Sequence, residues 1–536
     1  MEHSFVHDVS MSSIQSDAKD PSFVVPSSTS TSTPTSEENE EIGTWQEKKW
    51  LVNQSRLMQL FETCHQCGGG IMEPSISSAG SLIRIKWDCQ NGHSGLWSSC
   101  PDVRGMPENN LLVAASTLFT GATYTTIADW AELLNIQLPK KSTFYSIQSS
   151  YLIPVTDIKY NEQHKAIMER LLQTQYVVKE GVHVSGDGRS DSPGFSAKYN
   201  TYSFMEDTTK EIILFELVQV TETSSSTAME PVGFRRGLDY LLEEGVEVEV
   251  VTTNRSPSIR KIMREDYPDI HHEFDIWHVV KGLMKKLLAV SNRKDNRDLQ
   301  PWIKSICNHL WYACASCGGD PEDLIKKWQS LLYHICGVHR WEEDGEEKTC
   351  QHADLSPEQQ RRKRWIKKDS PAFKILSSIA LDKGIIKDLR HMALFKHTGK
   401  LEVFHASLLK YTEKRLHFHD SSMRARTQLA IMDHNENVQR EQATTASGRP
   451  RFNVVFPKAT KDWVARKIYL PTTQTFRKNL VVEALQRRRD SSVKFKDPTS
   501  LQPSPNPAQQ KLSPVQPKAQ HSPEEPHPAL TLPSPE

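Results

Sequence analysis

The spacing of apolar residues after position 175 predicts a mixed α/β domain. Several short runs alternate between apolar and polar residues, as half-buried strands require, and two longer runs have the period of an amphipathic helix. The expected strands are residues 182–185, 198–204, 211–220 and 246–251, and the expected helices are residues 232–244 and 258–265. A meander of three strands is thus followed by alternating helices and strands.

That order of elements is the order of the ribonuclease H-like fold, in which the first and fourth strands lie side by side. We therefore predict an α/β fold class with a ribonuclease H-like catalytic core, interrupted by a helical insertion and preceded by two small modules. The expected boundaries are 55–105 for a zinc-binding hairpin, 106–155 for a helix-turn-helix-like segment, 176–290 and 391–487 for the two parts of the core, and 291–390 for the insertion.

Before the core, the apolar residues take the period of short helices. Residues 110–119 and 125–134 form two such stretches, and Ser142 can cap the start of a third. Three short helices joined by tight turns resemble a helix-turn-helix, whose third helix enters the major groove of DNA while Lys140 and Lys141 contact phosphate. Ordinary packing of three helices explains the same pattern equally well.

The two ends of the chain differ in composition from the middle. Residues 1–45 are rich in Ser and Thr with eight acids against one base, and residues 491–536 are rich in Pro, Ser and Gln with four of each. We expect a disordered acidic arm and a disordered Pro-rich tail, because neither has enough apolar surface to fold. The middle then holds 61 bases against 54 acids, which permits polyanion binding but also suits a solvated surface.

No apolar run approaches the ~18 residues of a membrane helix, and the N-terminus has no secretory signal pattern. We therefore expect an intracellular protein without a membrane partner. In a reducing compartment the nine cysteines are better explained as metal ligands or buried thiols than as disulfides.

The first candidate metal site lies in the N-terminal module. Cys64 and Cys67 are followed, after a strand pattern, by Cys89 and His93. Two closely spaced thiolates on one turn, with a Cys and a His on another, can converge on zinc and close a small β-hairpin. Cys100 is the alternative ligand if His93 points away, and four unrelated buried residues are the competing explanation.

The insertion contains a second set of closely spaced ligands. Cys336 and His339 form one pair, and Cys350 and His352 form the other. We predict a second structural zinc site here. The cysteines at the two ends of residues 314–317 are a rival pair, and solvent-facing side chains are the simpler alternative.

A basic cluster follows in the same insertion. It consists of Arg361, Arg362, Lys363 and Arg364, with Lys367 and Lys368 close behind. Such a run is typical of a nuclear import signal, of a contact with the DNA backbone or of a solvated face. We expect a nuclear protein on the first two interpretations.

Three positions in the core have the chemistry of a metal-dependent nuclease site. Asp187 follows the first strand within Gly-Asp-Gly, Asn254 follows the fourth strand, and Glu402 begins a helix after the insertion. Two magnesium ions ~3.5 to 4 Å apart can clamp the attacking and leaving oxygens of a phosphodiester, and they prefer carboxylate ligands. Asn254 stands where the second acid is needed. Its neutral amide cannot bridge two metals, so we expect impaired catalysis.

Other residues support this site or compete for a place in it. Asp275 and His278, three residues apart at the start of a helix, can hydrogen-bond each other or face the pocket, and we expect them to orient its wall. Asp388 is the reserve third acid. The simpler explanations for Asp187 and Glu402 are a turn residue and a favourable charge near a helix N-terminus.

Together these motifs resemble those of eukaryotic cut-and-paste DDE transposases, and most closely those of the Kolobok-like group. The matching segments are residues 64–67 with 89–93, Gly-Asp187-Gly, Thr-Thr-Asn254-Arg-Ser, Phe-Asp275-Ile-Trp-His278, His397-Thr-Gly-Lys-Leu-Glu402 and Leu429-Ala-Ile-Met-Asp-His-Asn435. The resemblance spans residues 55 to 485. It implies magnesium-dependent strand cleavage and transfer by a ribonuclease H-like core, binding of double-stranded DNA at transposon terminal repeats, and the homodimer common among strand-transfer enzymes.

The chain departs from that family at Asn254, where an Asp is expected, and the N-terminal arm lacks the pattern of a THAP-type zinc module. The favoured interpretation is therefore a transposase-derived DNA-binding protein, a degenerate or domesticated copy. One alternative is an active magnesium-dependent transposase or endonuclease. Another is a zinc-dependent transcription or chromatin scaffold.

Overall fold

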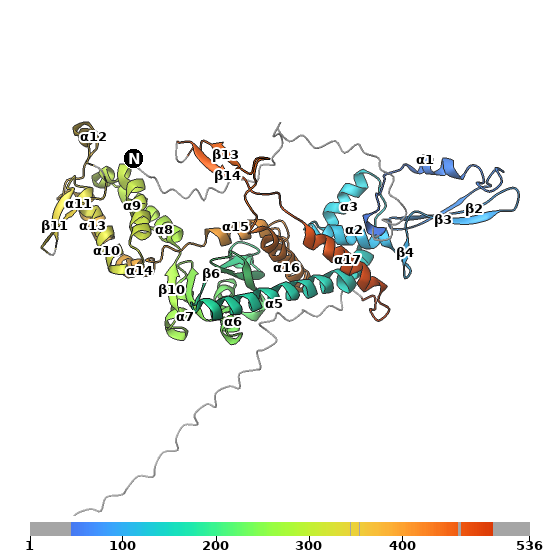
Figure 1. The fold of residues 1–536 in the computed structure, drawn as a ribbon, viewed down its shortest axis with the longest axis horizontal. Helices are drawn as coiled ribbons and strands as arrows, with labels where there is room; N and C mark the ends of the chain where they lie inside the picture. The colour runs from blue at the N-terminus through green and yellow to red at the C-terminus, as the bar shows by residue number, and fades with distance from the viewer. Residues whose placement is uncertain (1–43, 344, 353, 459–461, 497–536) are drawn as a thin grey trace, which may run out of the picture.

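The computed structural model describes residues 44–343, 345–352, 354–458 and 462–496 (Figure 1). The expected acidic arm lies outside these residues apart from positions 44 and 45. Residues 491–496, which were expected to belong to a disordered tail, are instead placed against the fold, because the backbone N–H of Lys496 donates to Ser150 Oγ at 2.7 Å and Phe495 stacks on Tyr151. The rest of the tail, from residue 497, lies outside the described part.

The centre of the fold is a five-stranded mixed sheet. Its strands are β6 (Val182–Ser190), β7 (Tyr199–Glu206), β8 (Ile212–Gln219), β9 (Val248–Thr253) and β10 (His271–Phe274), in the order β10-β9-β6-β7-β8. β6, β9 and β10 are mutually parallel, whereas β7 is antiparallel to both of its neighbours. The sequence pattern does not predict β10, because its four residues begin with two histidines and a glutamate.

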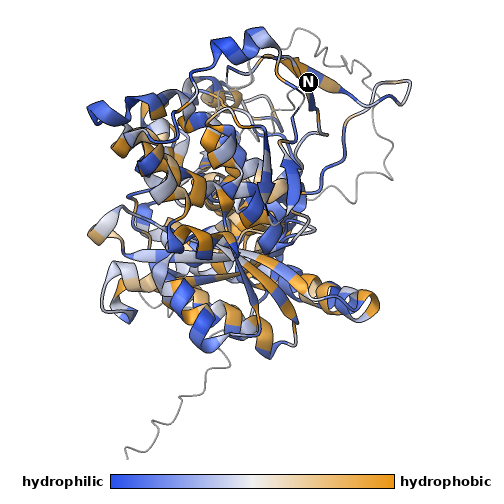
Figure 2. Cartoon of the chain, turned by 90° about the vertical axis from the view of Figure 1, so that its left-hand side faces the viewer, coloured by the Kyte–Doolittle hydropathy of each residue, from blue (hydrophilic) through white to orange (hydrophobic). Residues whose placement is uncertain are grey.

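Helices cover both faces of this sheet, which explains why β7 is buried along its whole length. On one face, α6 (Met229–Glu243) and α7 (Pro257–Asp266) pack against Val184, Tyr202 and Phe204. On the other face lie α5 (Ile153–Val178), α15 (Gly399–Leu408) and α16 (Asp420–Asn437), whose apolar residues pack with Met205 and Phe215. Figure 2 shows hydrophobic residues concentrated in the strands and in the helices around them.

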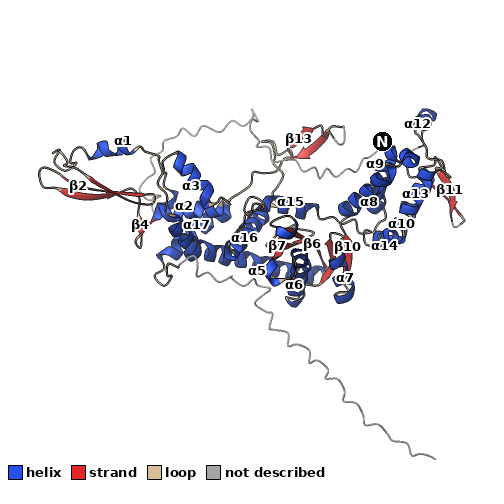
Figure 3. Cartoon of the chain, turned by 180° about the vertical axis from the view of Figure 1, so that it is seen from behind, coloured by secondary structure: helices blue, strands red, loops and turns tan. Residues whose placement is uncertain are grey.

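The N-terminal helices are α2 (Glu108–Phe119), α3 (Tyr124–Leu133) and α4 (Lys141–Ile147). All three were expected, but α4 is not a short separate helix. It continues through a π-helical turn, Gln148–Leu152, into α5, and the combined helix runs from this bundle to the sheet (Figure 3). The continuation has a physical reason, because residues 148–153 are all buried, and Tyr151, Leu152 and Ile153 belong to the same apolar core as residues of α2 and α17 (Thr475–Arg489).

The insertion is a helical body with its own hydrophobic core. It begins at α8 (Ile276–Ser291) rather than at residue 291, because Val279, Leu283 and Leu287 pack into that core. Cys314 and Cys317 are buried in it, and the Cys317 thiol donates to the Ala393 carbonyl at 3.3 Å. The remaining elements are a 3-10 segment (Lys294–Trp302), α9 (Ile303–Ser316), α10 (Pro321–Gln329), α11 (Leu331–His334), β11 (Arg340–Glu343), β12 (Glu346–Thr349), α12 (Pro357–Arg362), α13 (Pro371–Ala380) and α14 (Lys383–Leu389).

Small sheets complete the fold. An antiparallel sheet of β1 (Ser75–Ala79), β2 (Leu82–Asp88) and β3 (Ser94–Ser98) follows the short α1 (Gln54–Met58), and β4 (Asp102–Val103) pairs with β5 (Met106–Pro107). Near the C-terminus, β13 (Phe452–Val455) and β14 (Val464–Lys467) form a hairpin that stands away from the central sheet (Figure 1). Within the described residues, no helix combines the length and the apolar character needed to cross a bilayer.

Gly121, after α2, has a positive φ of 89°, and a Cβ there would lie 2.2 Å from the backbone oxygen of Lys410. We expect Gly121→Ala to lower the free energy of unfolding by about 3 kcal/mol, because it adds a backbone clash to a strained φ. Gly448→Ala is the matched control, since Gly448 has a φ of 76° but nothing within 4 Å, and should cost only about 1 kcal/mol. Urea titration measures both; equal losses would contradict the clash.

Candidate functional site

Asp187 lies within β6 and not beyond its end as the sequence pattern suggested, because the strand continues to Ser190. The flanking glycines explain the continuation. A Cβ at Gly186 would lie 2.6 Å from the Tyr202 hydroxyl, and a Cβ at Gly188 would lie 2.8 Å from Cγ of Glu230. The Gly-Asp-Gly motif is therefore a strand segment whose glycines leave room for neighbouring side chains, not a turn.

Asn254 follows β9 and lies in direct contact with Asp187. Its Nδ2 donates to Oδ1 of Asp187 at 3.2 Å and to Oε1 of Glu230 at 3.1 Å, while its Oδ1 accepts the backbone N–H of Ser256 at 2.9 Å. The contact with Ser256 orients the amide, so that the nitrogen and not the oxygen faces the carboxylates. A single neutral side chain thus links two acids.

Glu230 is a site residue that the sequence analysis missed. It lies in the first turn of α6, where a glutamate is usually explained by the helix dipole. Burial raises the pKa of Glu230; the hydrogen bond from Asn254 opposes this rise, and the charge of Asp187 adds to it. The signal in the sequence was the acid at the start of the helix that follows the meander, which becomes informative only when β6 and α6 are placed together.

Glu402 lies in the first turn of α15, as expected. Its Oε1 is 3.6 Å from Nε2 of His278, and one turn later Nδ1 of His405 lies 3.4 Å from Oδ2 of Asp187. Burial raises the pKa of Glu402, the charges of Asp275 and Asp187 add to the rise, and His278 opposes it. The structure therefore brings Glu402 to the same cluster as Asp187, with His405 as a second residue that the sequence analysis missed.

Asp275 holds the wall of this cluster in place. Its Oδ1 caps α8 by accepting the backbone N–H of Trp277 at 2.7 Å, and its Oδ2 accepts the backbone N–H and the hydroxyl of Thr398. His278 lies 3.9 Å from the same Oδ2. Asp275 thereby ties the start of the insertion to the segment just before α15.

Asp388, the reserve acid, is not part of the cluster. It is buried in α14, where its two oxygens lie 2.6 Å from Nη2 of Arg255 and 3.1 Å from Nη2 of Arg260. Its charge is therefore offset by two arginines. Those contacts hold α14 against the start of α7.

The carboxylates of the acid cluster do not form a tight group of potential metal ligands among the described residues. Among the described residues, the groups of three or more His, Cys, Asp or Glu side chains whose ligand atoms all lie within 4.8 Å are two Cys/His clusters, and the carboxylates form neither. Asn254 directs its two N–H groups at the acids that a cation would otherwise bridge. Asp187, Glu230 and Glu402 are the carboxylates that could hold the magnesium predicted from the sequence. The Asn254 amide lies between the first two of them.

The first predicted Cys/His set converges. The Sγ of Cys67 lies 3.8 Å from that of Cys89, and Nδ1 of His93 lies 3.5 Å from Sγ of Cys89 and 3.9 Å from Sγ of Cys64. Tetrahedral zinc requires edges of about 3.8 Å between sulfurs and about 3.6 Å between sulfur and nitrogen. The four residues can hold a metal ion such as zinc, and Cys100 is not among them.

The local fold prepares this cluster for a cation. The backbone N–H of Gly68, at a φ of 70°, donates to the carbonyl of Cys64 at 2.7 Å and closes the turn between the two cysteines. The backbone N–H of Gly69 and the Asn91 amide lower the pKa of Cys67 to about 6. A thiolate, the form that binds zinc, is therefore favoured at neutral pH.

The second Cys/His set also converges, but with one ligand different from the prediction. His334 joins His339, Cys350 and His352, whereas Cys336 is not in the cluster. Cys336 instead packs against the hydrophobic core of the insertion. The prediction was wrong at this position because short sequence spacing favoured Cys336, while the last residue of α11, His334, faces the β11–β12 hairpin.

The residues proposed to contact DNA are all exposed. Lys140 and Lys141 stand at the start of α4. In the basic cluster, Arg362 pairs with Glu358 at 2.5 Å and the Lys363 ammonium lies 5.5 Å from the centre of the Trp365 ring. These contacts leave the cluster on the surface of the insertion.

His272 on β10 gives the core a measurable pH dependence. It is buried against Thr253, with Nε2 2.8 Å from the threonine hydroxyl. Burial lowers the pKa of His272 from 6.5 to about 3, and the nearby His391, Arg260 and His271 add to the effect. Between pH 6.5 and about 3, the folded state therefore binds fewer protons than the unfolded state. The contribution of neutral His272 to the free energy of unfolding is complete above pH 6.5 and is lost as the pH falls.

We expect acidification from pH 7 to pH 5 to cost about 2 kcal/mol through His272 alone. The variant His272→Gln, which cannot take up a proton, should show a correspondingly smaller loss between the two pH values in urea titrations. His164 and His434, whose pKa values are also lowered by burial, are present in both proteins and cancel in the comparison. An unchanged pH dependence in the variant would contradict the assignment.

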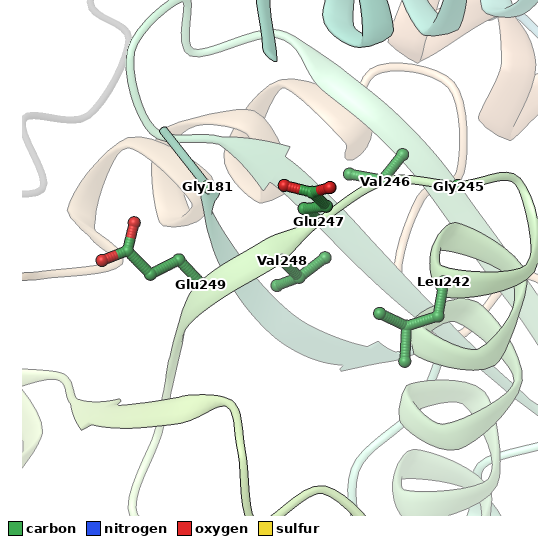
Figure 4. A pocket seen from close by; sticks show the side chains of 7 residues that line it. All are labelled: Gly181, Leu242, Gly245, Val246, Glu247, Val248 and Glu249. Carbon is green, nitrogen blue, oxygen red and sulfur yellow. The ribbon is translucent and has the colours of Figure 1, made fainter. Parts of the chain in front are cut away.

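A surface pocket lies at the opposite end of β9 from Asn254 (Figure 4). It is lined by Gly181, Leu242 and residues 245–249, with the carboxylates of Glu247 and Glu249 at its edge. Glu249 lies 3.6 Å from His183. This pocket does not include any residue of the acid cluster.

No family model matches the chain, and no curated protein matches its sequence.

Proposed function

We propose that this chain is a transposase-derived DNA-binding protein whose ribonuclease H-like core has lost most of its catalytic capacity. Numbered from β6, the sheet has the strand order 5-4-1-2-3, with only the second strand antiparallel to its neighbours. This order supports a ribonuclease H-like fold. The helical insertion between β10 and α15 supports the likeness to cut-and-paste transposases.

Asn254 is the observation that carries the loss of catalysis. In a two-metal site, carboxylates repel one another until a cation is bound, and this repulsion helps to make the site selective for metal. Here the Asn254 amide donates one N–H to each of two carboxylates. The acids are therefore stabilised without a metal, and binding magnesium would require these hydrogen bonds to break.

Exposed basic and aromatic side chains support the DNA-binding part of the proposal. Besides the lysines before α4 and the basic cluster of the insertion, the β13–β14 hairpin exposes Phe452 and Trp463 beside Arg466 and Lys467. Lys and Arg side chains that contact phosphate, together with aromatic rings that stack on nucleotides, are the usual components of a protein surface that binds nucleic acid.

An active endonuclease is the second candidate, and Glu230 is the observation that favours it. Glu230 accepts a hydrogen bond from Asn254 and lies close enough to Asp187 for their charges to interact. It could supply the carboxylate that position 254 lacks. In that case Asp187, Glu230 and Glu402 would share the metals.

A plasmid-nicking assay with Mg²⁺ or Mn²⁺ tests both candidates on the full chain. The native protein should nick supercoiled DNA no faster than Asp187→Ala, while both bind duplex DNA with the same salt dependence in fluorescence anisotropy. Metal-dependent nicking that is lost in Asp187→Ala and in Glu230→Gln would instead establish the active enzyme. Absence of salt-dependent binding would refute the DNA-binding proposal itself.

A further inference from the structure

The β11–β12 hairpin and the segment after it form an arm, defined here as residues 336–364, that is folded without a core of its own. None of the arm residues whose side chains the structure describes is fully buried. Its main apolar contacts are at its base, where Tyr333 stacks on Trp341 at 4.9 Å and Trp365 packs beside His334 and His339. A segment with so little apolar burial needs another constraint to offset the entropy of ordering it.

Three imidazoles and one thiol meet at the base of this arm. The ring centres of His334, His339 and His352 lie 4.9 to 5.1 Å apart in every pairing, with interplanar angles from 74° to 86°. Nε2 of His352 is 3.2 Å from Nδ1 of His339, and Sγ of Cys350 is 3.6 Å from Nδ1 of His334. The rings therefore do not stack on one another but direct ring nitrogens toward a common point.

We propose that these four residues bind a second zinc ion and that this ion folds the arm. A tetrahedral site with three nitrogens and one sulfur requires edges of about 3.3 Å between nitrogens and about 3.6 Å between nitrogen and sulfur, which match the two separations above. The four ligand atoms all lie within 4.8 Å of one another. Three imidazoles with one thiolate suit zinc better than calcium or magnesium, which prefer oxygen ligands.

The hairpin register explains how ligands distant in sequence converge. Arg340 pairs with Thr349, so His339 and Cys350 lie side by side at the open end of the hairpin, and the backbone N–H of Cys350 donates to the carbonyl of His339 at 2.9 Å. His334, at the end of α11, closes the site from the helical body. The ion would thus link the body to both strands of the arm.

The zinc site also lies beside the basic cluster, because Trp365, which follows Arg364, packs against His334 and His339. The indole N–H of Trp302 donates to the carbonyl of Arg364 at 2.8 Å, and the backbone N–H of Ile366 donates to Ile335 at 3.0 Å. These contacts hold only the C-terminal end of the arm, whereas the metal ligands hold its other end. In Figure 1 this site and the β1–β3 module lie at opposite ends of the molecule, so the two metal sites can be removed independently.

Metal analysis of the purified full chain, with matched variants, tests the proposal. We expect two zinc ions per chain in the native protein, one in His334→Ala and two in Cys336→Ser, which removes the nearby thiol that lies outside the cluster. His334→Cys, which keeps a zinc ligand at this position, should retain both ions. Cys67→Ser should lose the ion of the N-terminal module alone.

Trypsin provides a second readout, because its cleavage sites are concentrated at residues 361–368. Cleavage there should be at least tenfold faster in His334→Ala than in the native protein or Cys336→Ser, while the helical body stays intact. The proposal is overturned if the native chain holds one zinc ion that Cys67→Ser removes, or if Cys336→Ser loses an ion that His334→Ala retains. Neither result depends on whether the protein binds DNA.

Discussion

Asn254→Asp is expected to lower the free energy of unfolding by about 3 kcal/mol without divalent metal, and to regain most of that loss in Mg²⁺ or Mn²⁺. The native amide donates to Asp187 at 3.2 Å and to Glu230 at 3.1 Å. The variant replaces these two hydrogen bonds with a third negative charge in a partly buried site, which costs several kcal/mol unless a cation is bound. Urea titrations with and without metal measure both parts.

Asn254→Ala is the matched control, because it removes the two donors without adding a charge. It should lose about 1 to 2 kcal/mol and regain less of that loss in metal than Asn254→Asp does, because it lacks the additional carboxylate. The contrast isolates the effect of charge from that of lost hydrogen bonding. Identical stability of Asn254→Asp in chelator and in metal would show that the cluster cannot assemble a cation site, even with the acid restored.

Cys89→Ser should unfold the N-terminal module, residues 62–98, while leaving the central sheet intact. Cys89 is 2 % exposed and contacts both Cys67 and His93. The apolar cluster around the ligands consists of Cys64, Trp87 and Cys89, with Phe61 and Ile71 packed against it, and Leu82 and Ile85 are buried elsewhere on β2. So small a core cannot offset the entropy of ordering the segment. A structural zinc contributes about 10 to 16 kcal/mol in small domains, so losing a ligand should remove the module's fold entirely.

Hydrogen exchange measures this outcome segment by segment. Amides of β2 and β3 should exchange at the rate of an unfolded chain in Cys89→Ser, and equally in the native protein treated with a strong chelator, while β6 to β8 keep their protection. Cys100→Ser is the control, since Cys100 lies outside the cluster, and should match the native protein. Retained protection of β2 in Cys89→Ser would mean that the module does not depend on a metal.

The alternation of apolar and polar residues predicted most strands of the sheet, because that alternation lies within the residues of each strand. The four expected strands of the sheet all occur, although β6 is longer than expected and β10 was missed. Alternation ends at the glycines of β6, and β10 is too short and too polar to show any alternation. Both errors concern strands whose placement depends on neighbours, here Tyr202 beside Gly186 and β9 beside β10.

Short-range spacing found the first Cys/His cluster completely and the second only in part. Cys64 and Cys67 lie on one turn, Cys89 and His93 lie on the turn between β2 and β3, and the β-bridge between Ile71 and Cys89 brings the two turns together. At the second cluster, the ligand from the helical body is His334, five residues before His339, whereas the nearer Cys336 packs against the hydrophobic core of the insertion. Spacing therefore identifies ligands on the same turn but not those supplied by another element.

The sequence by itself determined the α/β character of the chain, its helical insertion, and the presence of Asn254 at the end of the fourth strand. Only the tertiary structure decided that Asn254 links Asp187 to Glu230, that His405 faces Asp187, and that His334 completes the second cluster. The reason is physical: periodicity and turn chemistry act over a few residues, whereas these contacts join side chains from different elements whose relative positions depend on packing.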